Sequence, residues 1–368
     1  MFGRVPAARR MVTADPRRLA VSLLGVGAAI GLVLLLQGLW NGQLVQITAY
    51  EDHVGADLFV AQPDTESLLG DTSRVPLSAL EPIRALPMVR AADPAHLHAT
   101  ITELHGGKEF VFIAGYAPTG LGGPWELTDG RTARAGGEAV VDSILAEEHG
   151  LTIGDSFDIK GREFEVVGLS ENSRSWMAAF IFVTDDSARL LTGSGETASF
   201  ILVQTDQPAE AAAAIEEITG LSAVDPAFLA ENDRQVLAGI MENPVLLMIG
   251  IAFAAATLVV ALTVYSGVVE RLREYGIVKA IGAGRLRILR LILGQTVLLA
   301  VVGSGIGYLM YLGGVWLVGR LRPQFWFSLE WRHLLVITAA SAVMALVAAV
   351  MPVRRLGRLD PASVYRGW

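Results

Sequence analysis

Residues 270–290 read ERLREYGIVKAIGAGRLRILR, a basic stretch that is broken by glycine and lies between two long uncharged runs. Its first twelve residues contain good helix formers and no proline, which predicts a short helix. That helix is predicted to end at Gly282, because glycine fits the left-handed conformation of helix C-termini. Arg285 then begins a second helix. The stretch is therefore interpreted as a short helix and a tight turn between two apolar segments.

The chain contains four apolar segments that are long enough to cross a membrane. Of its 368 residues 52% are hydrophobic, and the mean hydropathy is +0.47, which is too apolar for a soluble domain of this size. About 20 apolar residues span the hydrocarbon of a bilayer. The first segment is longer than the core of a signal peptide, which favours a retained anchor. The predicted transmembrane helices are residues 19–42, 243–269, 291–319 and 334–353.

Basic residues predict the orientation of these spans, because short basic flanks stay in the cytoplasm. They gather in residues 1–18, 270–290 and 354–368. The sequence therefore predicts a multi-pass protein of the cell membrane with both termini cytoplasmic and with residues 43–242 outside. The short loop at 320–333 is then also external, although its three arginines go against the rule.

The predicted external domain differs in charge from the rest of the chain. From Glu51 to Glu242 the sequence has 11 Lys and Arg against 32 Asp and Glu, whereas the remainder has 18 against 5. Such an acidic domain argues against nucleic acid as a partner. The sequence has no cysteine, so the 368 residues contain no disulfide, no thiolate metal site and no cysteine nucleophile.

Interspersed strand and helix patterns predict an α+β fold for this domain. Gly150 is a suitable C-cap and Asp185 a suitable N-cap for two short helices. A hairpin is predicted to turn at Lys160 and Gly161. A longer helix is predicted from about residue 225 into the second span, with a proline at 244 that can kink it. The predicted strands are residues 54–60, 109–116, 157–168, 178–184 and 198–205.

No motif in the chain predicts an enzyme. The patterns G-x-S-x-G, H-E-x-x-H and G-x-x-x-x-G-K-[ST] are all absent. His96 and His98 could bind zinc or copper with the nearby Asp93, Glu103 or His105. The alternative is a strand face with scattered polar residues, which is favoured because this spacing matches no common metal motif. No catalytic residue and no metal site is predicted, and the domain is interpreted as a module for binding and force transmission.

The charged stretch at 270–290 has two interpretations. It could be a basic loop that only fixes orientation and touches lipid phosphates. However, Glu270 and Glu274 share one side of the predicted helix with isoleucines, while Lys279 lies roughly opposite. A helix made only to lie on lipid would have a cleaner apolar stripe. Both charge signs and a glycine break suit docking on a cytoplasmic protein that pushes on the spans.

The same stretch, extended to residue 293, resembles the signature of the FtsX-like permease family of ABC transporters. Residues 352–366, PVRRLGRLDPASVYR, are similar to the closing segment of that family, and residues 136–169 resemble the MacB-like periplasmic core domain. The residues of the first stretch that match the signature are Glu270, Arg271, Arg273, Glu274, Gly276, Lys279, Ala280, Gly282, Ala283 and Ile288.

This resemblance implies the membrane subunit of a type VII ABC exporter, an α-helical membrane protein with four transmembrane helices and an α+β extracytoplasmic domain. It implies a homodimer bound to a separate cytoplasmic ATPase, which holds ATP and magnesium, so this chain itself needs no cofactor. Segment 270–290 would be the coupling helix. Its implied ATPase-coupling residues are Glu270, Arg271, Arg273, Glu274, Gly276, Lys279, Gly282 and Arg285.

The family further implies export of amphipathic or hydrophobic compounds by mechanotransmission, with membrane lipid around the spans. One alternative is a mechanical regulator that activates an extracytoplasmic cell-wall hydrolase, and another is an ATPase-independent sensor. Haem is a specific substrate hypothesis, because Tyr50, His53, Met241 and Glu242 lie near the outer ends of the first two spans and include haem-ligand types. Ordinary interface residues are the alternative interpretation.

Small residues are predicted to allow close packing of the spans. Gly27 and Gly31 form a G-x-x-x-G pattern in the first span, and Gly303 and Gly307 form another in the third. Glycine is also generally common in membrane helices, so the patterns alone leave both interpretations open.

Overall fold

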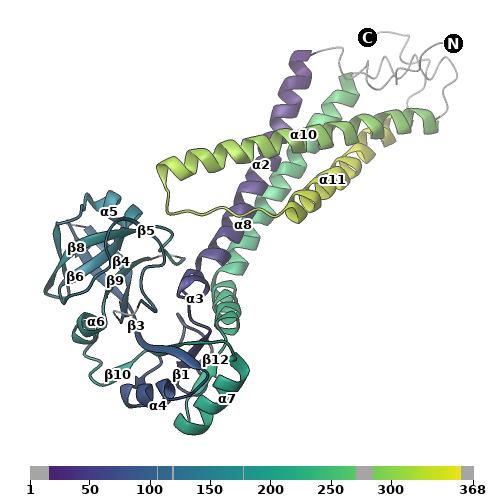
Figure 1. Cartoon of the computed structure of the whole chain (residues 1–368). Helices are drawn as coiled ribbons and strands as arrows, with labels where there is room; N and C mark the ends of the chain where they lie inside the picture. Colours follow the sequence, from purple (N-terminus) through teal and green to yellow (C-terminus); the bar gives the residue numbers. More distant parts are fainter. Residues whose placement is uncertain (1–15, 106, 118–119, 177, 271–284, 358–368) are drawn as a thin grey trace, which may run out of the picture. The chain divides into compact units, whose positions relative to one another are not determined.

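The structure is a computed structural model that describes residues 16–105, 107–117, 120–176, 178–270 and 285–357 (Figure 1). Its internal contacts divide the chain into two compact units. The helical unit comprises residues 1–42 and 243–368, and the sheet unit comprises residues 43–242.

The long helices supply the apolar segments. Among the described residues, three stretches are long and apolar enough to cross a membrane: Ala20–Gln46, Pro226–Gly267 and Thr296–Leu321. The last helix has a shorter apolar stretch, Trp331–Val343, so the predicted fourth span stays a prediction. The long helices are α2 (Pro16–Gln46), α8 (Pro226–Glu270), α10 (Arg285–Leu321) and α11 (Trp331–Gly357).

One half of the sheet unit, the first lobe, is a four-stranded antiparallel sheet in the order β12-β1-β11-β3. With one helix after β1 and one after β11, this order is that of a split β-α-β fold. Ile83 and Ile215 of these helices pack on one face with Val60 and Val203. The elements are β1 (Leu58–Ala61), β3 (Val89–Leu104), β11 (Phe200–Thr205), β12 (Ser222–Val224), α4 (Leu80–Arg84) and α7 (Pro208–Thr219).

The other half, the second lobe, is inserted between β3 and β11 and closes into a barrel. Its strands pair in the ring β3-β4-β9-β6-β8-β7 and return to β3 through Glu103 and Asp158. Aliphatic and aromatic side chains, among them Ile113, Phe157 and Ile181, form its core. The elements are β4 (Gly107–Tyr116), β5 (Leu127–Gly130), β6 (Glu138–Asp142), α5 (Ser143–His149), β7 (Ser156–Ile159), β8 (Arg162–Ser170), β9 (Ala179–Thr184) and α6 (Asp185–Thr192).

An aromatic core contains residues of both lobes. Phe180 is fully buried, with its ring centroid 5.5 Å from that of Tyr50 and 5.9 Å from those of Trp125 and Phe182. Phe59 of the first lobe belongs to the same core. The small elements that complete the unit are α3 (Ala49–His53), β2 (Val75–Pro76), the 3₁₀ turn Leu77–Ala79 and β10 (Thr197–Ala198), which pairs with β2.

Two local predictions are confirmed, and two others are wrong only in the residue at which the element starts. The hairpin turns at Lys160 and Gly161, whose φ angles are 52° and 79°, and Gly150 ends α5 in the left-handed conformation. Asp185, however, is the first residue of α6 rather than its cap, because the hydroxyl of Thr184 accepts the hydrogen bond from the helix. The strand predicted at 54–60 begins only at Leu58.

Candidate functional site

The predicted coupling segment lies mostly outside the described residues. Glu270 is the last described residue of α8 and has an exposed side chain, and Arg285 is the first residue of α10. Their coupling role stays a prediction. The other predicted coupling residues, Arg271, Arg273, Glu274, Gly276, Lys279 and Gly282, lie outside the described residues.

The four glycines of the two G-x-x-x-G patterns meet at one contact between α2 and α10. A Cβ atom on Gly27 would lie 2.6 Å from Cγ2 of Ile306, and one on Gly31 would lie 3.1 Å from the carbonyl oxygen of Gly307. A Cβ atom on Gly303 would meet α2 just as closely, at 2.6 Å. Side chains at these positions would push the helices apart, so the glycines let two backbones approach within one chain.

Two buried carboxyl groups form what we call the acid joint, Glu51 of α3 and Asp233 of α8. Asp233 accepts hydrogen bonds from the hydroxyl of Ser67 and, at 3.1 Å, from the backbone N–H of Leu68. Both carboxyl oxygens of Glu51 are buried and have no hydrogen-bond partner among the described residues. Burial raises the pKa of Glu51 well above its ordinary value, and the adjacent Asp233 raises it further. Both effects favour the protonated, uncharged form of Glu51.

Arg234, the residue after Asp233 on α8, contacts the end of α2 and the start of α3. Its guanidinium donates to the Thr48 hydroxyl at 3.0 Å and to the carbonyl oxygen of Leu44 at 3.3 Å, and it lies 3.8 Å from Asp52. Successive residues of α8 thus hold two different segments: Asp233 binds the loop after β1, and Arg234 binds the end of α2. The arrangement fixes the start of α8 to the sheet unit.

The residues of the haem hypothesis have different environments. Tyr50 is buried, and its hydroxyl donates to the carbonyl oxygen of Gly122 at 3.4 Å. Burial raises the pKa of Tyr50, so its phenol is neutral. His53 stacks on Trp125, with its Nδ1 atom 2.8 Å from the carbonyl oxygen of Ala49. To bind a haem iron, the Tyr50 hydroxyl would have to leave the aromatic core.

Met241 and Glu242, the other two residues of that hypothesis, lie on α8. Met241 is half-buried and Glu242 is exposed. The structure stacks His53 and packs Tyr50 on Trp125, whereas it brings neither α8 residue into that aromatic group. Haem as a ligand stays a prediction.

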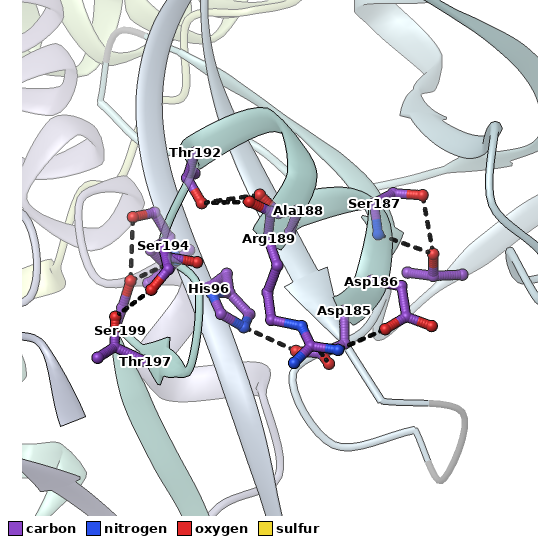
Figure 2. A network of polar contacts seen from close by, with 12 residues as sticks. His96, Asp185, Asp186, Ser187, Ala188, Arg189, Thr192, Ser194, Thr197 and Ser199 are labelled. Atoms are coloured by element: carbon purple, nitrogen blue, oxygen red, sulfur yellow. Dashed lines mark hydrogen bonds and ion pairs between the residues drawn. The ribbon is translucent and has the colours of Figure 1, made fainter. Parts of the chain in front are cut away.

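A polar network surrounds His96 where the two lobes meet (Figure 2). His96 is buried, and its Nε2 lies 2.7 Å from Oδ1 of Asp185, which is also 3.4 Å from Arg189 through its other oxygen. Arg189 in turn lies 2.6 Å from Asp186. The network ties α6 to β3 and uses the carboxylates near His96 as ion-pair partners. Among the described residues no group of three or more His, Cys, Asp or Glu could hold a metal ion.

A groove opens beside this network, and we call it the junction groove. It consists of two adjacent hollows of about 220 and 240 Å³ that share Thr72, Ser73, Leu97, His98 and Ser199. His98 accepts a hydrogen bond from the ammonium group of Lys160 at 2.7 Å. Burial lowers the pKa of His98, and the charge of Lys160 lowers it further, so the imidazole is neutral at pH 7.

The acid joint and the groove were not predicted, although a signal for the first exists in the sequence. Leu229, Asp233 and Leu237 follow each other at a spacing of four, so the aspartate lies on an apolar helix stripe. Both leucines are buried. An acid in such a stripe indicates a buried carboxylate with a specific partner.

Comparison with known proteins agrees with this architecture. Residues 19–221 match the MacB-like periplasmic core domain, and residues 246–361 match the FtsX-like permease C-terminal domain. The uncharacterized ABC transporter permease Rv0072 of Mycobacterium tuberculosis is 26% identical over 98% of this chain and 99% of its own length.

Two further comparisons involve proteins named MacB. The macrolide export ATP-binding/permease protein MacB of Hyphomonas neptunium is 24% identical over 98% of this chain, which spans 60% of that protein. The crystal structure of the periplasmic region of MacB from Actinobacillus actinomycetemcomitans aligns with 49% of this chain and 94% of its own, at 10% identity and a TM-score of 0.40. Because the core-domain match covers more than half of the chain and the permease match follows it in order, the chain belongs to the MacB-like, FtsX-like family of ABC transporter permeases.

Proposed function

We propose that this chain is the membrane subunit of an ABC exporter for amphipathic or hydrophobic compounds. The family supports a permease, and the MacB relative, which is named a macrolide export protein, supports export. The chain itself has no phosphate-binding loop in its sequence. ATP hydrolysis would therefore belong to a separate cytoplasmic ATPase that binds segment 270–290.

One observation carries the mechanism: α8 is a single helix of 45 residues. Near its start, Asp233 is bound by the loop after β1, and at its end Glu270 opens the predicted coupling segment. The 37 residue steps from Asp233 to Glu270 correspond to about 55 Å of helix. A displacement at the cytoplasmic end would thus reach the loop that Asp233 binds.

Pro244 gives this helix a point at which it can bend. It lies inside α8, next to the first residue of the helical unit, Asn243. A proline inside a helix removes one backbone hydrogen bond and clashes with the preceding turn. We expect the helix to transmit rotation and translation while Pro244 sets the angle of the bend.

The remaining features of the proposal are those predicted from the sequence. Residues 334–353 would be the fourth span, both termini would be cytoplasmic, and two copies of the chain would bind two ATPases. Haem stays one possible substrate within the proposed class.

The decisive test is a pull-down of the tagged protein from native membranes in mild detergent. We expect a separate ABC ATPase with the wild type and none with Glu274→Lys or Gly282→Pro. Glu330→Lys is the matched control, because it reverses an exposed charge on the predicted opposite side of the membrane. It should retain the ATPase.

An intact wild-type protein without an ATPase would overturn the coupling proposal and favour a sensor. Recovery of a cell-wall hydrolase together with the ATPase, and no transport of amphipathic compounds by the complex in vesicles, would favour the mechanical regulator.

A further inference from the structure

The strand β3 has an unpaired edge in its middle. On one side β4 pairs with it from His96 to Leu104. On the other side β11 pairs with it only up to Ala95, and β7 only at Glu103. Among the described residues no strand therefore neighbours residues 97–101 on that side, over a length of about 13 Å.

The backbone groups of this edge point into the gap. The N–H of Leu97 donates to the hydroxyl of Ser199 at 3.0 Å, and that hydroxyl lies 3.3 Å from the carbonyl oxygen of Leu97. Alternate residues of a strand direct their backbone groups to the same side. Ala99 and Ile101 consequently direct theirs into the gap, where no described residue pairs with them.

The junction groove lies along this edge. One of its hollows is lined by Leu68, Leu69 and Phe112, together with Ala99. Farther along the same face Ile101 is 64% exposed, although it is a large aliphatic residue. Exposed apolar side chains beside an open strand edge are the features that proteins usually cover or block.

Positive charge adjoins the groove. Arg74 lines the other hollow, is exposed, and has no ion-pair partner among the described residues. Lys160 binds His98, which is neutral and therefore leaves the ammonium charge uncompensated. The carboxylate of Asp71, which also lines the groove, accepts hydrogen bonds from two backbone N–H groups. A carboxylate on a ligand would find complementary charge here, within a domain that is otherwise acidic.

We propose that the open edge of β3 binds an extended segment of another extracytoplasmic polypeptide, which adds a strand in the junction groove. Its backbone would pair with Ala99 and Ile101, as in other cases of strand addition. Alternate side chains would then lie on the apolar face beside Leu69 and Phe112. The intervening ones would lie on the face of His98, where Arg74 and Lys160 favour acidic residues. This inference goes beyond transport and does not depend on an ATPase.

The pattern of backbone groups along the groove supports this kind of ligand. Backbone donors and acceptors repeat along the edge at the spacing of a peptide, whereas a compact molecule would use only one or two of them. An extended chain therefore uses both hollows and the edge between them.

The test uses the full-length protein in nanodiscs and a labelled, capped hexapeptide that alternates valine and glutamate. We expect saturable binding by fluorescence anisotropy. A peptide N-methylated at alternate residues, which loses donors without changing charge, should bind at least about fivefold more weakly, as expected for one lost hydrogen bond. A valine–lysine peptide should also bind more weakly.

Two protein variants test the location. Ile101→Pro removes one open N–H, and proline is tolerated on a strand edge; it should weaken binding at least about fivefold. Arg74→Glu should weaken binding of the valine–glutamate peptide and strengthen binding of the valine–lysine peptide. Equal binding of the N-methylated peptide, or unchanged binding by both variants, would overturn the proposal.

The absence of any binding would also overturn it, and a change of oligomeric state in Ile101→Pro would then assign the edge to a second copy of the chain. Retention of the ATPase by Ile101→Pro in the pull-down would separate this result from the coupling mechanism.

Discussion

The helical unit and the sheet unit achieve close packing in opposite ways. At the α2–α10 contact, side chains are missing, and Gly27 and Gly307 let the backbones approach. In the sheet unit, large side chains fill the space, and Phe180 contacts four other aromatic rings. Lipid competes for apolar side chains, whereas water drives them together. The same chain therefore packs by backbone proximity in one unit and by buried side-chain volume in the other.

The largest effect is expected from removing volume in the sheet unit. Phe180→Ala should lower the free energy of unfolding by about 3–5 kcal/mol, because it leaves a cavity in the aromatic core. Thermal unfolding of the detergent-solubilised protein measures the change. Phe228→Ala is the control, since Phe228 is 47% exposed and its loss should cost little. Similar losses in both variants would remove the contrast between the units.

In the helical unit, adding volume should be harmful. Gly307→Val should destabilise the protein by about 1–3 kcal/mol, because a Cβ atom there would lie 3.0 Å from Ile30 and from the carbonyl oxygen of Gly27. Gly305→Val is the matched control two residues away, where an added Cβ meets nothing within 4 Å. Unfolding in SDS compares the two variants. Equal stability would show that the glycines do not hold the helices together.

A third effect, of about 1 kcal/mol or more, should come from the acid joint and depend on pH. The raised pKa of Glu51 means that the folded protein binds this proton more tightly than the unfolded chain. Its contribution is therefore intact below the ordinary glutamate pKa and is lost as the pH rises toward the raised folded value. Glu51→Gln cannot ionise, so it should be more stable than the wild type at pH 8 and equal at pH 4.

Glu138 provides the control of opposite sign. The Arg131 guanidinium, 2.7 Å away, lowers the pKa of Glu138 to about 2. This contribution is present above the ordinary pKa and is lost as the pH falls toward 2. Glu138→Gln should therefore lose a little stability at pH 7 and none near pH 2. Parallel pH profiles for the two glutamine variants would contradict the protonated state of Glu51.

The smallest effect is expected at Tyr50. Its hydroxyl makes one long hydrogen bond of 3.4 Å, so Tyr50→Phe should change stability by less than about 1 kcal/mol. The same variant tests haem binding. If haemin shifts its Soret band with the wild-type protein, Tyr50→Phe should leave that shift unchanged, because the phenol is buried. Loss of the shift would show that the aromatic core opens to place Tyr50 on the iron.

Local patterns made much of the fold predictable. The predicted turn at Lys160 and Gly161 is confirmed, and its local signal is Gly161, whose φ of 79° is one that glycine adopts without strain. The helix predicted from about residue 225 is confirmed as α8. The hydrophobic period of a segment and the residues that cap a helix depend only on residues close together in the sequence. They can therefore be recognised without a structure.

Features that depend on distant residues could not be predicted. Glu51 and Asp233 are separated by most of the sheet unit. The apolar stripe around Asp233 indicates a buried acid, but no local pattern identifies Glu51 as the group beside it. The gap along β3 exists because β11 and β7 both stop short of residues 97–101. No residue pattern near the end of either strand indicates where its pairing with β3 stops. The glycine patterns suggested close packing, but only the structure pairs Gly27 with Ile306 and Gly307.

The strand β3 also affects the order in which the strands of the sheet unit can pair as the chain emerges outside the membrane. Its second half pairs with β4 immediately after it, so the barrel lobe can form from consecutive segments. Its first half waits for β11, since Ala95 pairs with Phe200 more than 100 positions later. Long-range pairing is slow because a large loop must be closed first. We expect the barrel to form early. The first half of β3 should stay unpaired on its β11 side until β11 has also emerged.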